Sequence, residues 1–410
     1  MATLHPFRAL RPAPDIAARV AAVPYDVVST DEARALADDN PLSFLRVSRA
    51  ELELPADTDP YSDAVYRRAT QNFAGLRDRS LVVEDEPSVY FYRLRMGGHV
   101  QTGLAACFSI DEYDRDVIKK HEWTRRDKED DRTRHMLALG AQTGPVFLTY
   151  RAQADVTRVA ARATAPAPLI DFTAVDGVQH TIWRVTGADR DALVAAFGGI
   201  PALYIADGHH RAASAARARA EMRERGIRGT SLGDGADAST MLAVAFPHDQ
   251  VQILSYNRTV KDLGGLTPAD FTSALRERFE VEAGPPAPAR RGDISMYFQH
   301  GWHTLRPRVP PNAADPIASL DVSALQEMLL APVLKIADVR TDKRIDFVGG
   351  ARGTTALEAA VDSGKAAVGF SLYPVSGADL MAVADAGEIM PPKSTWFEPK
   401  LRDGLLIHLI

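Results

Sequence analysis

Residues 203–211 read Leu203-Tyr204-Ile205-Ala206-Asp207-Gly208-His209-His210-Arg211. The first four residues are apolar and include a β-branched side chain, which predicts a buried strand. The Asp-Gly pair is typical of a sharp turn. The alanine-rich segment from Ala212 to Glu224 predicts a helix. The sequence therefore predicts a strand that delivers an acid, two imidazoles and a guanidinium to the N-terminus of a helix.

Such a corner between a strand and a helix is suited to an anion. The first N–H groups of a helix lack partners within the helix, and the helix dipole is positive at that end. Arg211 adds a planar guanidinium whose N–H groups can donate to two phosphate oxygens. The alternative is a plain Asp-Gly turn whose histidines bond to nearby carbonyl groups. Four polar residues in one corner favour the anion site.

Composition describes an ordinary globular protein with room for two or three domains. The chain has 410 residues, of which 46% are hydrophobic and 25% charged. Cys107 is the only cysteine, so an intramolecular disulfide and a multi-cysteine zinc site are excluded, and we expect a reducing compartment, the cytoplasm. Residues 1–11 resemble no signal peptide, and we expect no membrane span. A net charge of −6 disfavours nucleic acid and leaves small anionic ligands as partners.

The order of predicted elements gives a mixed α/β fold class. Strands alternate with helices along most of the chain, and the early part also predicts an antiparallel hairpin. We expect three regions: an N-terminal α/β region at 1–160, a core at 170–283, and a C-terminal α/β region at 290–410. Segments rich in alanine and proline at 161–169 and 283–288 suit the connections between them.

Individual elements follow from local signals. Ser29 and Glu32 form a capping-box pattern that opens a short helix ending by Pro41. We predict further helices at 61–77, 323–329 and 354–363, strands at 89–96, 100–110, 241–246, 251–254, 345–349 and 367–373, and a loop of small residues at 231–238.

A second polar segment, residues 119–132, is dense in charges of both signs. Such a run is usually the solvated face of a helix held by ion pairs one turn apart. It also carries Trp123 and places Glu122 among cations, which a solvated helix does not require. Glu122 is therefore a candidate general base whose charge Lys120 or Arg126 would hold.

Two further segments are polar. Residues 390–400 hold too much proline for a helix and too many polar groups for a core strand. A loop there could wrap a phosphate or carboxylate, with Lys393 as the first residue to test, or could be a stiff loop pinned by Trp396 and Phe397. Residues 338–344 alternate in charge before a strand, a pattern that is more typical of an exposed surface than of a site.

Several familiar motifs are missing from the sequence. It contains no Walker loop, no Gly-x-Gly-x-x-Gly, no Gly-x-Ser-x-Gly and no His-Glu-x-x-His. His209 and His210 are neighbours, so on a helix they diverge by about 100° and do not easily share one metal. We expect one of them to face a ligand and the other to pack.

Several motifs follow one another in a characteristic order between Pro6 and the C-terminus. They are Pro24-Tyr25-Asp26-Val27, Asn40-Pro41, His121-Glu122-Trp123-Thr124 to Lys128-x-x-Asp131-Arg132, Gln142-Thr143-Gly144-Pro145, Asp207 to Arg211 and Met390 to Phe397. This ordered set resembles the bacterial domain of unknown function 1015 family. The Asp-Gly-His-His-Arg element is also similar to that of free-serine kinases in the ParB/sulfiredoxin-like superfamily. The resemblance implies a ParB/sulfiredoxin-like core, elaborated by α/β segments on both sides.

The resemblance also implies roles for single residues. In those kinases the element meets donor phosphates, and an acid elsewhere takes the proton of the serine hydroxyl. Glu122 is our first candidate for that acid, and Asp26 is the second. Asp207 would be a carboxylate next to either a metal ion or the acceptor hydroxyl. The remaining roles are catalytic for His210, donor-binding for Gly208, His209, His210, Arg211, Lys393, Ser394 and Thr395, and substrate-binding for Tyr25, Asp26, Arg126 and Trp396.

The function that the resemblance implies is phosphoryl transfer to a small hydroxylated metabolite, with free L-serine giving O-phosphoserine as the first candidate. The donor would be ATP, ADP or pyrophosphate, with Mg²⁺ near Asp207. Two alternatives stay open. One is a nucleotide-binding regulatory module like the ParB switches. The other is a hydrolase of phosphate esters or anhydrides that uses the same anion site.

Overall fold

The structure is a computed structural model that describes residues 1–226 and 238–410. Its contacts divide it into two compact units, which are described separately. Unit 1 contains Met1–Val251 and Pro399–Ile410, and unit 2 contains Gln252–Glu398. Most of the small-residue loop that we predicted at 231–238 lies outside the described residues. In the described part of the chain, no helix combines the length and the apolar character that crossing a membrane requires.

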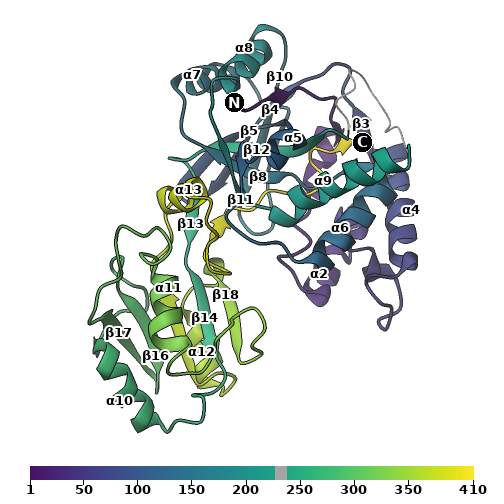
Figure 1. Ribbon diagram of the computed structural model, residues 1–410. Helices are drawn as coiled ribbons and strands as arrows, with labels where there is room; N and C mark the ends of the chain where they lie inside the picture. Colours follow the sequence, from purple (N-terminus) through teal and green to yellow (C-terminus); the bar gives the residue numbers. More distant parts are fainter. Residues whose placement is uncertain (227–237) are drawn as a thin grey trace. The chain divides into compact units, whose positions relative to one another are not determined.

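Unit 1 is built on a mixed sheet of nine strands among the described residues (Figure 1). Strand β11 pairs parallel with β6 and antiparallel with β8, and β12 pairs parallel with β8 and antiparallel with β5. The spatial order is β6 (Ile118–Lys119), β11 (Leu203–Asp207), β8 (Val146–Tyr150), β12 (Thr240–Pro247), β5 (His99–Ser109), β4 (Val89–Met96), β10 (Gln179–Val185) and β9 (Ile170–Thr173), with β1 (Leu4–His5) beside β5.

Helices and two short strand pairs complete unit 1. Helix α9 (His209–Glu224) packs its alanines on the sheet, where the small side chains allow close approach, and it runs beside α6 (Arg126–Leu139) in Figure 1. The other elements are η1 (Pro14–Ile16), α1 (Ala17–Val20), α2 (Thr30–Ala37), α3 (Leu45–Ser48), η2 (Ala50–Glu53), α4 (Asp63–Ser80), α5 (Ile110–Asp114), α7 (Ala154–Ala163) and α8 (Gly187–Phe197), with β2 (Leu10–Pro12) pairing β3 (Leu81–Val83) and β7 (Ala141–Gln142) pairing β21 (His408–Leu409).

Unit 2 has an antiparallel sheet of six strands among the described residues. The spatial order is β15 (Phe279–Ala283), β17 (Gly301–Pro307), β16 (Ile294–Phe298), β19 (Val368–Leu372), β14 (Tyr256–Val260) and β18 (Ile345–Gly349). The remaining elements are the pair β13 (Gln252–Leu254) and β20 (Trp396–Glu398), helices α10 (Pro268–Arg278), α11 (Asp321–Leu325), α12 (Thr355–Asp362) and α13 (Gly377–Asp385), the 3₁₀ turn η4 (Gly350–Arg352) and the π-helical segment η3 (Gln326–Leu330).

The predicted α/β class is confirmed, and so are most of the local elements. The Ser29 side chain accepts from the Glu32 N–H while the Glu32 carboxylate accepts from Ser29, as the capping box requires. The predicted hairpin is the β4–β5 pair. The two compact units differ from the three regions that we expected, because strands from 1–160 and from 170–283 share the sheet of unit 1.

Candidate functional site

The corner at residues 203–211 has the geometry that the sequence predicts, with one shift. Asp207 ends β11, and the register slips between Ile205 and Asp207, so a bulge aims the carboxylate away from the ladder. Gly208 has φ +93°, which suits glycine, and a Cβ there would lie 3.0 Å from Nε of Arg211. Helix α9 begins at His209 rather than Ala212, so both histidines and Arg211 stand on its first turn.

The two histidines hold the segment at 121–125 against this first turn. The His209 Nε2 accepts a long hydrogen bond (3.5 Å) from the backbone N–H of His121, and the rings of these two histidines meet edge to face with centroids 4.5 Å apart. The His210 Nε2 accepts from the backbone N–H of Arg125 at 3.0 Å. The histidine rings therefore join the two polar motifs of unit 1 that lie about 85 residues apart in the sequence.

The buried histidine pair is neutral at neutral pH. Burial lowers the pKa of His121 to about 4. Burial, and then the neighbouring His121, lower the pKa of His209 as well. His209 is 5% exposed, and its contact with His121 holds the 121–125 segment. Its predicted part in binding a donor phosphate stays a prediction.

Asp207 is an ionised carboxylate that holds two cations. Its Oδ2 lies 3.3 Å from Nη2 of Arg211 and 3.4 Å from Nζ of Lys400. Burial opposes ionisation of this carboxyl, but Lys400 and Arg211 together keep its pKa below the usual value. A carboxylate stabilised in this way is a weak proton acceptor. Asp207 is therefore suited to fixing Arg211 and Lys400 in place.

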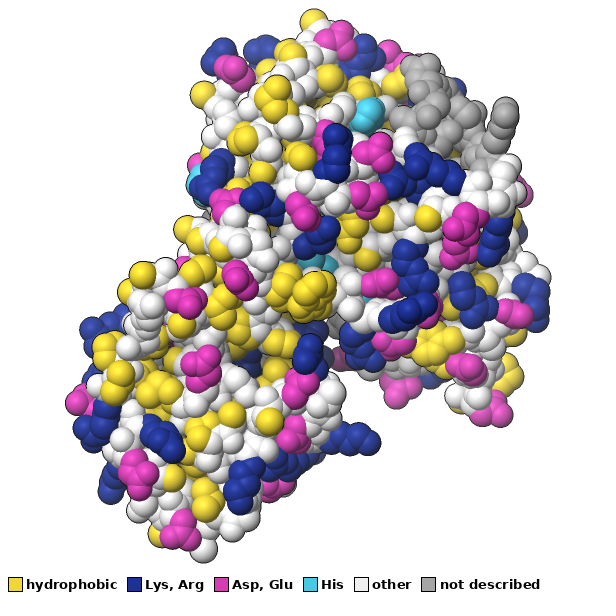
Figure 2. Space-filling view, viewed as in Figure 1, with side chains coloured by type: hydrophobic (Ala, Val, Ile, Leu, Met, Phe, Trp, Pro, Cys, Tyr) yellow, Lys and Arg dark blue, Asp and Glu magenta, His cyan; other side chains and the backbone are white. Residues whose placement is uncertain are grey.

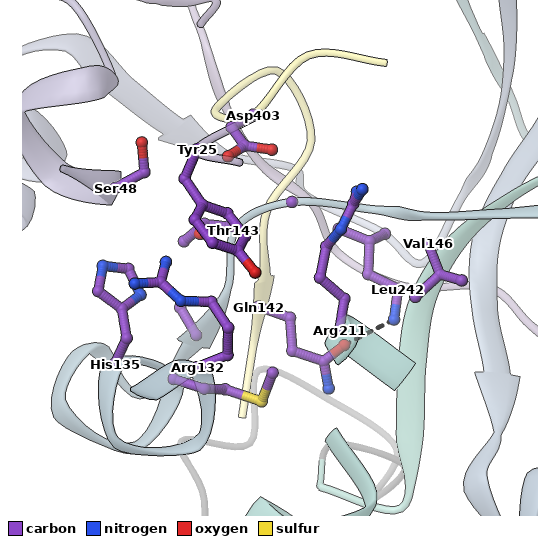
Figure 3. A pocket seen from close by; sticks show the side chains of 13 residues that line it. Tyr25, Ser48, Arg132, His135, Gln142, Thr143, Val146, Arg211, Leu242 and Asp403 are labelled. Atoms are coloured by element: carbon purple, nitrogen blue, oxygen red, sulfur yellow. Dashed lines mark hydrogen bonds between the residues drawn. The ribbon is translucent and has the colours of Figure 1, made fainter. Parts of the chain in front are cut away.

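Arg211 reaches into a pocket within unit 1 (Figure 3). The cavity measures about 40 Å³, enough for a few water molecules or one phosphoryl group. In Figure 3 the Tyr25 ring stands between the side chains of Arg132 and Arg211, and the Arg132 guanidinium lies 4.0 Å from the centre of that ring. The lining consists of Tyr25, Ser48, Arg132, His135, Met136, Ala141, Gln142, Thr143, Gly144, Val146, Arg211, Leu242 and Asp403.

Both guanidiniums of the pocket are largely buried, with 13% of the Arg132 side chain and 11% of the Arg211 side chain exposed. Burial opposes their charge, but Asp131 raises the pKa of Arg132, and Asp207 with Asp26 raises that of Arg211. The Arg132 Nη2 lies 2.7 Å from Asp131, and Arg211 Nη1 donates to the carbonyl of Pro145. The pocket thus contains two fixed cations at neutral pH, which is the arrangement that oxyanion binding requires.

Asp403 is the titratable acid of the pocket. Burial raises its pKa to about 7, against the influence of Arg211, while Asp26 raises it further. Its position depends on Gly144, where a Cβ would lie 2.5 Å from Oδ1 of Asp403. The backbone of Asp403 also exchanges two hydrogen bonds with Ala22. A carboxyl that titrates near pH 7 beside two cations can exchange a proton with a bound hydroxyl group.

A family model described as protein of unknown function (DUF1015) matches residues 4–323, more than half of the chain. The chain belongs to this family. A search of curated proteins found no match for this DUF1015 protein.

Solved structures with some likeness to this DUF1015 protein include a free serine kinase in complex with AMP, at 13% identity and a TM-score of 0.37, covering 74% of this chain and 91% of that one. A conserved hypothetical protein from Pyrococcus furiosus has 13% identity, a TM-score of 0.35 and coverages of 74% and 95%. A truncated SbnI from Staphylococcus aureus has 12% identity, a TM-score of 0.38 and coverages of 74% and 87%.

The structure brings together some of the residues predicted for the site. Tyr25 and Arg211 line one pocket, and Asp26 is close enough to influence the ionisation of both Arg211 and Asp403. Glu122 is not among the lining residues. Its Oε2 lies 4.0 Å from Nδ1 of His209.

The segment around Glu122 differs from the predictions. The Lys120 ammonium lies 2.8 Å from Asp116, and the role that we predicted for it beside Glu122 stays a prediction. The solvated helix that we considered for residues 119–132 covers only the second part of that segment, because α6 begins at Arg126. The Arg126 side chain is exposed.

The predicted donor residues near the C-terminus lie in unit 2. Lys393 is exposed, with φ +59°, and Ser394 is buried with its hydroxyl bonded to the carbonyl of Pro391. Thr395 is half-buried in the same loop. Trp396 begins β20, and its indole N–H donates to Glu398 at 2.8 Å. Their predicted part in binding donor or substrate stays a prediction.

Sequence reasoning missed three important residues of unit 1. Arg132 and Gly144 were quoted in the motifs that carry the family resemblance, so a signal for them was present. Asp403 had no such signal, because a single acid near the C-terminus belongs to no recognisable pattern. It reaches the pocket through backbone pairing with residues near position 22.

The residues around Asp207 do not form a resident metal site. Within 1–226 and 238–410, no group of three or more histidine, cysteine or acidic side chains is arranged to hold a metal ion. The Oδ2 of Asp207 contacts two cations, which would repel Mg²⁺. The predicted metal role of Asp207 therefore does not fit the residues present.

Proposed function

We propose that this protein transfers a phosphoryl group to the hydroxyl of a small metabolite, with free L-serine as the first candidate acceptor and O-phosphoserine as the product. The observation that carries the proposal is the pocket of unit 1, where two largely buried guanidiniums face a carboxyl whose pKa is about 7. Phosphoryl transfer needs charge neutralisation, positioning and a proton acceptor, and this pocket offers all three.

In the proposed step, Arg132 and Arg211 bind oxygens of the transferred phosphoryl group. The acceptor oxygen forms a bond to phosphorus while the bond from phosphorus to the donor oxygen breaks, and the leaving phosphate keeps that electron pair. The hydroxyl proton passes to a carboxylate. Asp403 lies in the pocket and is our first candidate for that acceptor, and Glu122 beside His209 is the second.

The donor is ATP, ADP or pyrophosphate. The cavity has room for one phosphoryl group, so the rest of the donor would lie outside it. A divalent ion bound to the donor phosphates would arrive as part of the substrate.

The experiment incubates the full chain with L-serine, Mg²⁺ and each donor in turn, and measures O-phosphoserine by mass spectrometry. We expect product with at least one donor. Absence of product with all three would remove serine kinase activity. Release of phosphate without any hydroxyl substrate would instead identify a hydrolase, and retention on DNA that depends on CTP would identify a ParB-like module.

Two variants separate the candidate proton acceptors. D403N should lower kcat with little effect on KM and should remove the pH dependence of kcat near pH 7. E122Q should leave that dependence in place if Asp403 is the acceptor. The reverse pattern would assign the proton to Glu122.

A further inference from the structure

A buried arginine in unit 2 has no counter-charge among the described residues. Arg258 lies on β14 and is 1% exposed. Its Nη1 donates to the carbonyl of Tyr256 at 2.6 Å, and its Nη2 donates to the carbonyls of Lys393 at 3.0 Å and Pro392 at 3.4 Å. In the described part of the chain, no carboxylate forms an ion pair with it. A buried guanidinium without a carboxylate is costly unless something compensates its charge.

Arg258 lines a cavity that lies within unit 2. The cavity volume is about 250 Å³, several times that of the pocket in unit 1. Its lining is mainly apolar, and its polar members other than Arg258 are Gln326, Asp338 and Arg340. Arg340 already forms an ion pair with Asp338 at 3.0 Å, so these two charges cancel and the charge of Arg258 remains. The cavity is lined by Arg258, Val322, Gln326, Ala337, Asp338, Val339, Arg340, Pro391 and Pro392.

A second polar side chain at this cavity, Gln326, has one atom without a hydrogen-bond partner. The Gln326 Nε2 donates to the carbonyls of Ile336 at 2.9 Å and Ala337 at 3.3 Å, which fixes the orientation of the amide. Its Oε1 is buried and accepts no hydrogen bond. Gln326 also opens the π-helical segment η3, a local geometry that is frequent at functional sites.

We propose that this cavity binds a small carboxylate with an apolar body, held by Arg258 through its carboxylate group. The three carbonyl contacts leave at least two of the five guanidinium N–H donors for a ligand. One uncompensated positive charge matches a monoanion better than a doubly charged phosphate. The valines and prolines of the lining would contact the apolar body. Burial lowers the pKa of Arg258 to about 10, as expected of a buried cation without a carboxylate beside it, and it remains charged at neutral pH.

The cavity suggests a function for the charged cluster at residues 338–344, for which the sequence favoured an exposed surface over a site. Residues 338–344 contribute Asp338, Val339 and Arg340 to its lining. The loop at 390–400, which the sequence offered as an anion cradle, contributes Pro391 and Pro392 and two backbone carbonyls that hold Arg258. The residue that binds the anion in this region of unit 2 would thus be Arg258, a buried arginine on a strand. The sequence pattern did not single it out.

The probes for this site are isovalerate, its neutral isostere isovaleramide, and inorganic phosphate. Binding to the full chain is measured by saturation-transfer NMR and calorimetry. We expect isovalerate to bind and the other two not to bind at the same concentration. Binding of isovaleramide as strong as that of isovalerate would overturn the role of charge. Binding of phosphate without isovalerate would overturn the carboxylate class, and binding of none of the three would overturn the site.

Variants locate the binding. R258M should weaken isovalerate binding by at least about tenfold, because the charge-assisted contact is lost. V339W should also weaken it by filling the cavity without changing any charge. R211M changes only the pocket of unit 1 and should bind isovalerate like the wild type. If R258M does not fold, V339W and R258K decide, and unchanged affinity in V339W would contradict the proposal.

Discussion

Both units contain buried arginines, but the groups that contact their guanidiniums differ. In the pocket of unit 1, Arg132 and Arg211 each lie beside a carboxylate, at 2.7 Å from Asp131 and 3.3 Å from Asp207. In the cavity of unit 2, Arg258 contacts backbone carbonyls, and no carboxylate of the described residues pairs with it. The guanidiniums of unit 1 are thus held by carboxylates, whereas that of Arg258 is held by backbone carbonyls, which leave its net charge in place and which an anion would balance under the proposal above.

This difference indicates which kind of ligand suits the pocket of unit 1 and which suits the cavity of unit 2. A preorganised pair of cations beside a titratable carboxyl suits chemistry, since little reorganisation is needed when charge develops. A buried cation without a carboxylate partner, in a cavity with a mainly apolar lining, suits recognition of one charge and one apolar shape. On the face of the molecule that Figure 2 displays, cationic and acidic side chains are interspersed. The buried arginines are therefore a better guide to function than the exposed charges.

The largest effect that we expect from the comparison concerns Arg211. R211M should lower kcat/KM for phosphoryl transfer by about 10² to 10³, because one preorganised cation of the pocket is lost. The matched control is R217M on the same helix, whose half-exposed side chain pairs with Glu129 and Asp130. Steady-state kinetics of both variants make the test. Equal losses in the two variants would show that the effect is not specific to the pocket.

Asp403 should make the free energy of unfolding decrease as the pH rises from about 4 to about 7. Its pKa is about 7 in the folded chain and about 3.8 in the unfolded one, so the folded state holds the extra proton between pH 4 and 7. The contribution is complete below pH 4 and is lost by pH 7, with roughly 4 kcal/mol as the upper limit. Denaturant unfolding from pH 4 to 8 should therefore show a flatter profile for D403N than for the wild type. The exposed Asp78→Asn serves as the control, and a D403N profile parallel to the wild type would contradict the burial of this acid.

Gly144 should prove necessary to the shape of the pocket. In G144A the new Cβ would stand 2.5 Å from Oδ1 of Asp403, so the carboxyl or the 142–145 segment must move. We expect a loss of about 1–3 kcal/mol in the free energy of unfolding, together with weaker activity. G98A lies in the open β4–β5 turn with nothing within 4 Å of the new atom, and should change stability by at most about 0.5 kcal/mol. Equal stability of the two variants in urea would show that the contact can relax freely.

The smallest effect should appear in the pH dependence of anion binding. Protonation of Asp403 removes a negative charge near Arg211, so sulfate, whose own charge is constant from pH 6 to 8, should bind a few-fold more tightly at pH 6. Calorimetric titrations at the two pH values measure this. D403N should bind sulfate equally at both. A wild type that binds sulfate equally at both would place Asp403 too far from the anion to act on it.

Sequence patterns predicted the elements better than they predicted the site. The strand at 203–207, the capping box at Ser29 and the hairpin across Gly97-Gly98 each follow from signals within a few residues. The pocket instead depends on segments distant in the chain, since backbone pairing brings Asp403 beside residue 22. Charged neighbours in the sequence favoured Glu122 as a general base, but they did not indicate that Lys120 pairs with Asp116 or that His121 is buried. Burial, which decides the ionisation of Asp403 and His121, cannot be read from local sequence.

The most direct test of the central claim is calorimetric binding of pyrophosphate to the wild type, R132M, R211M and R217M. The claim is that Arg132 and Arg211 together bind a phosphoryl group in the pocket of unit 1. We expect the wild type and R217M to bind with equal affinity, and each pocket variant to bind at least about tenfold more weakly. Folded R132M and R211M proteins that bind pyrophosphate as tightly as the wild type would contradict the claim.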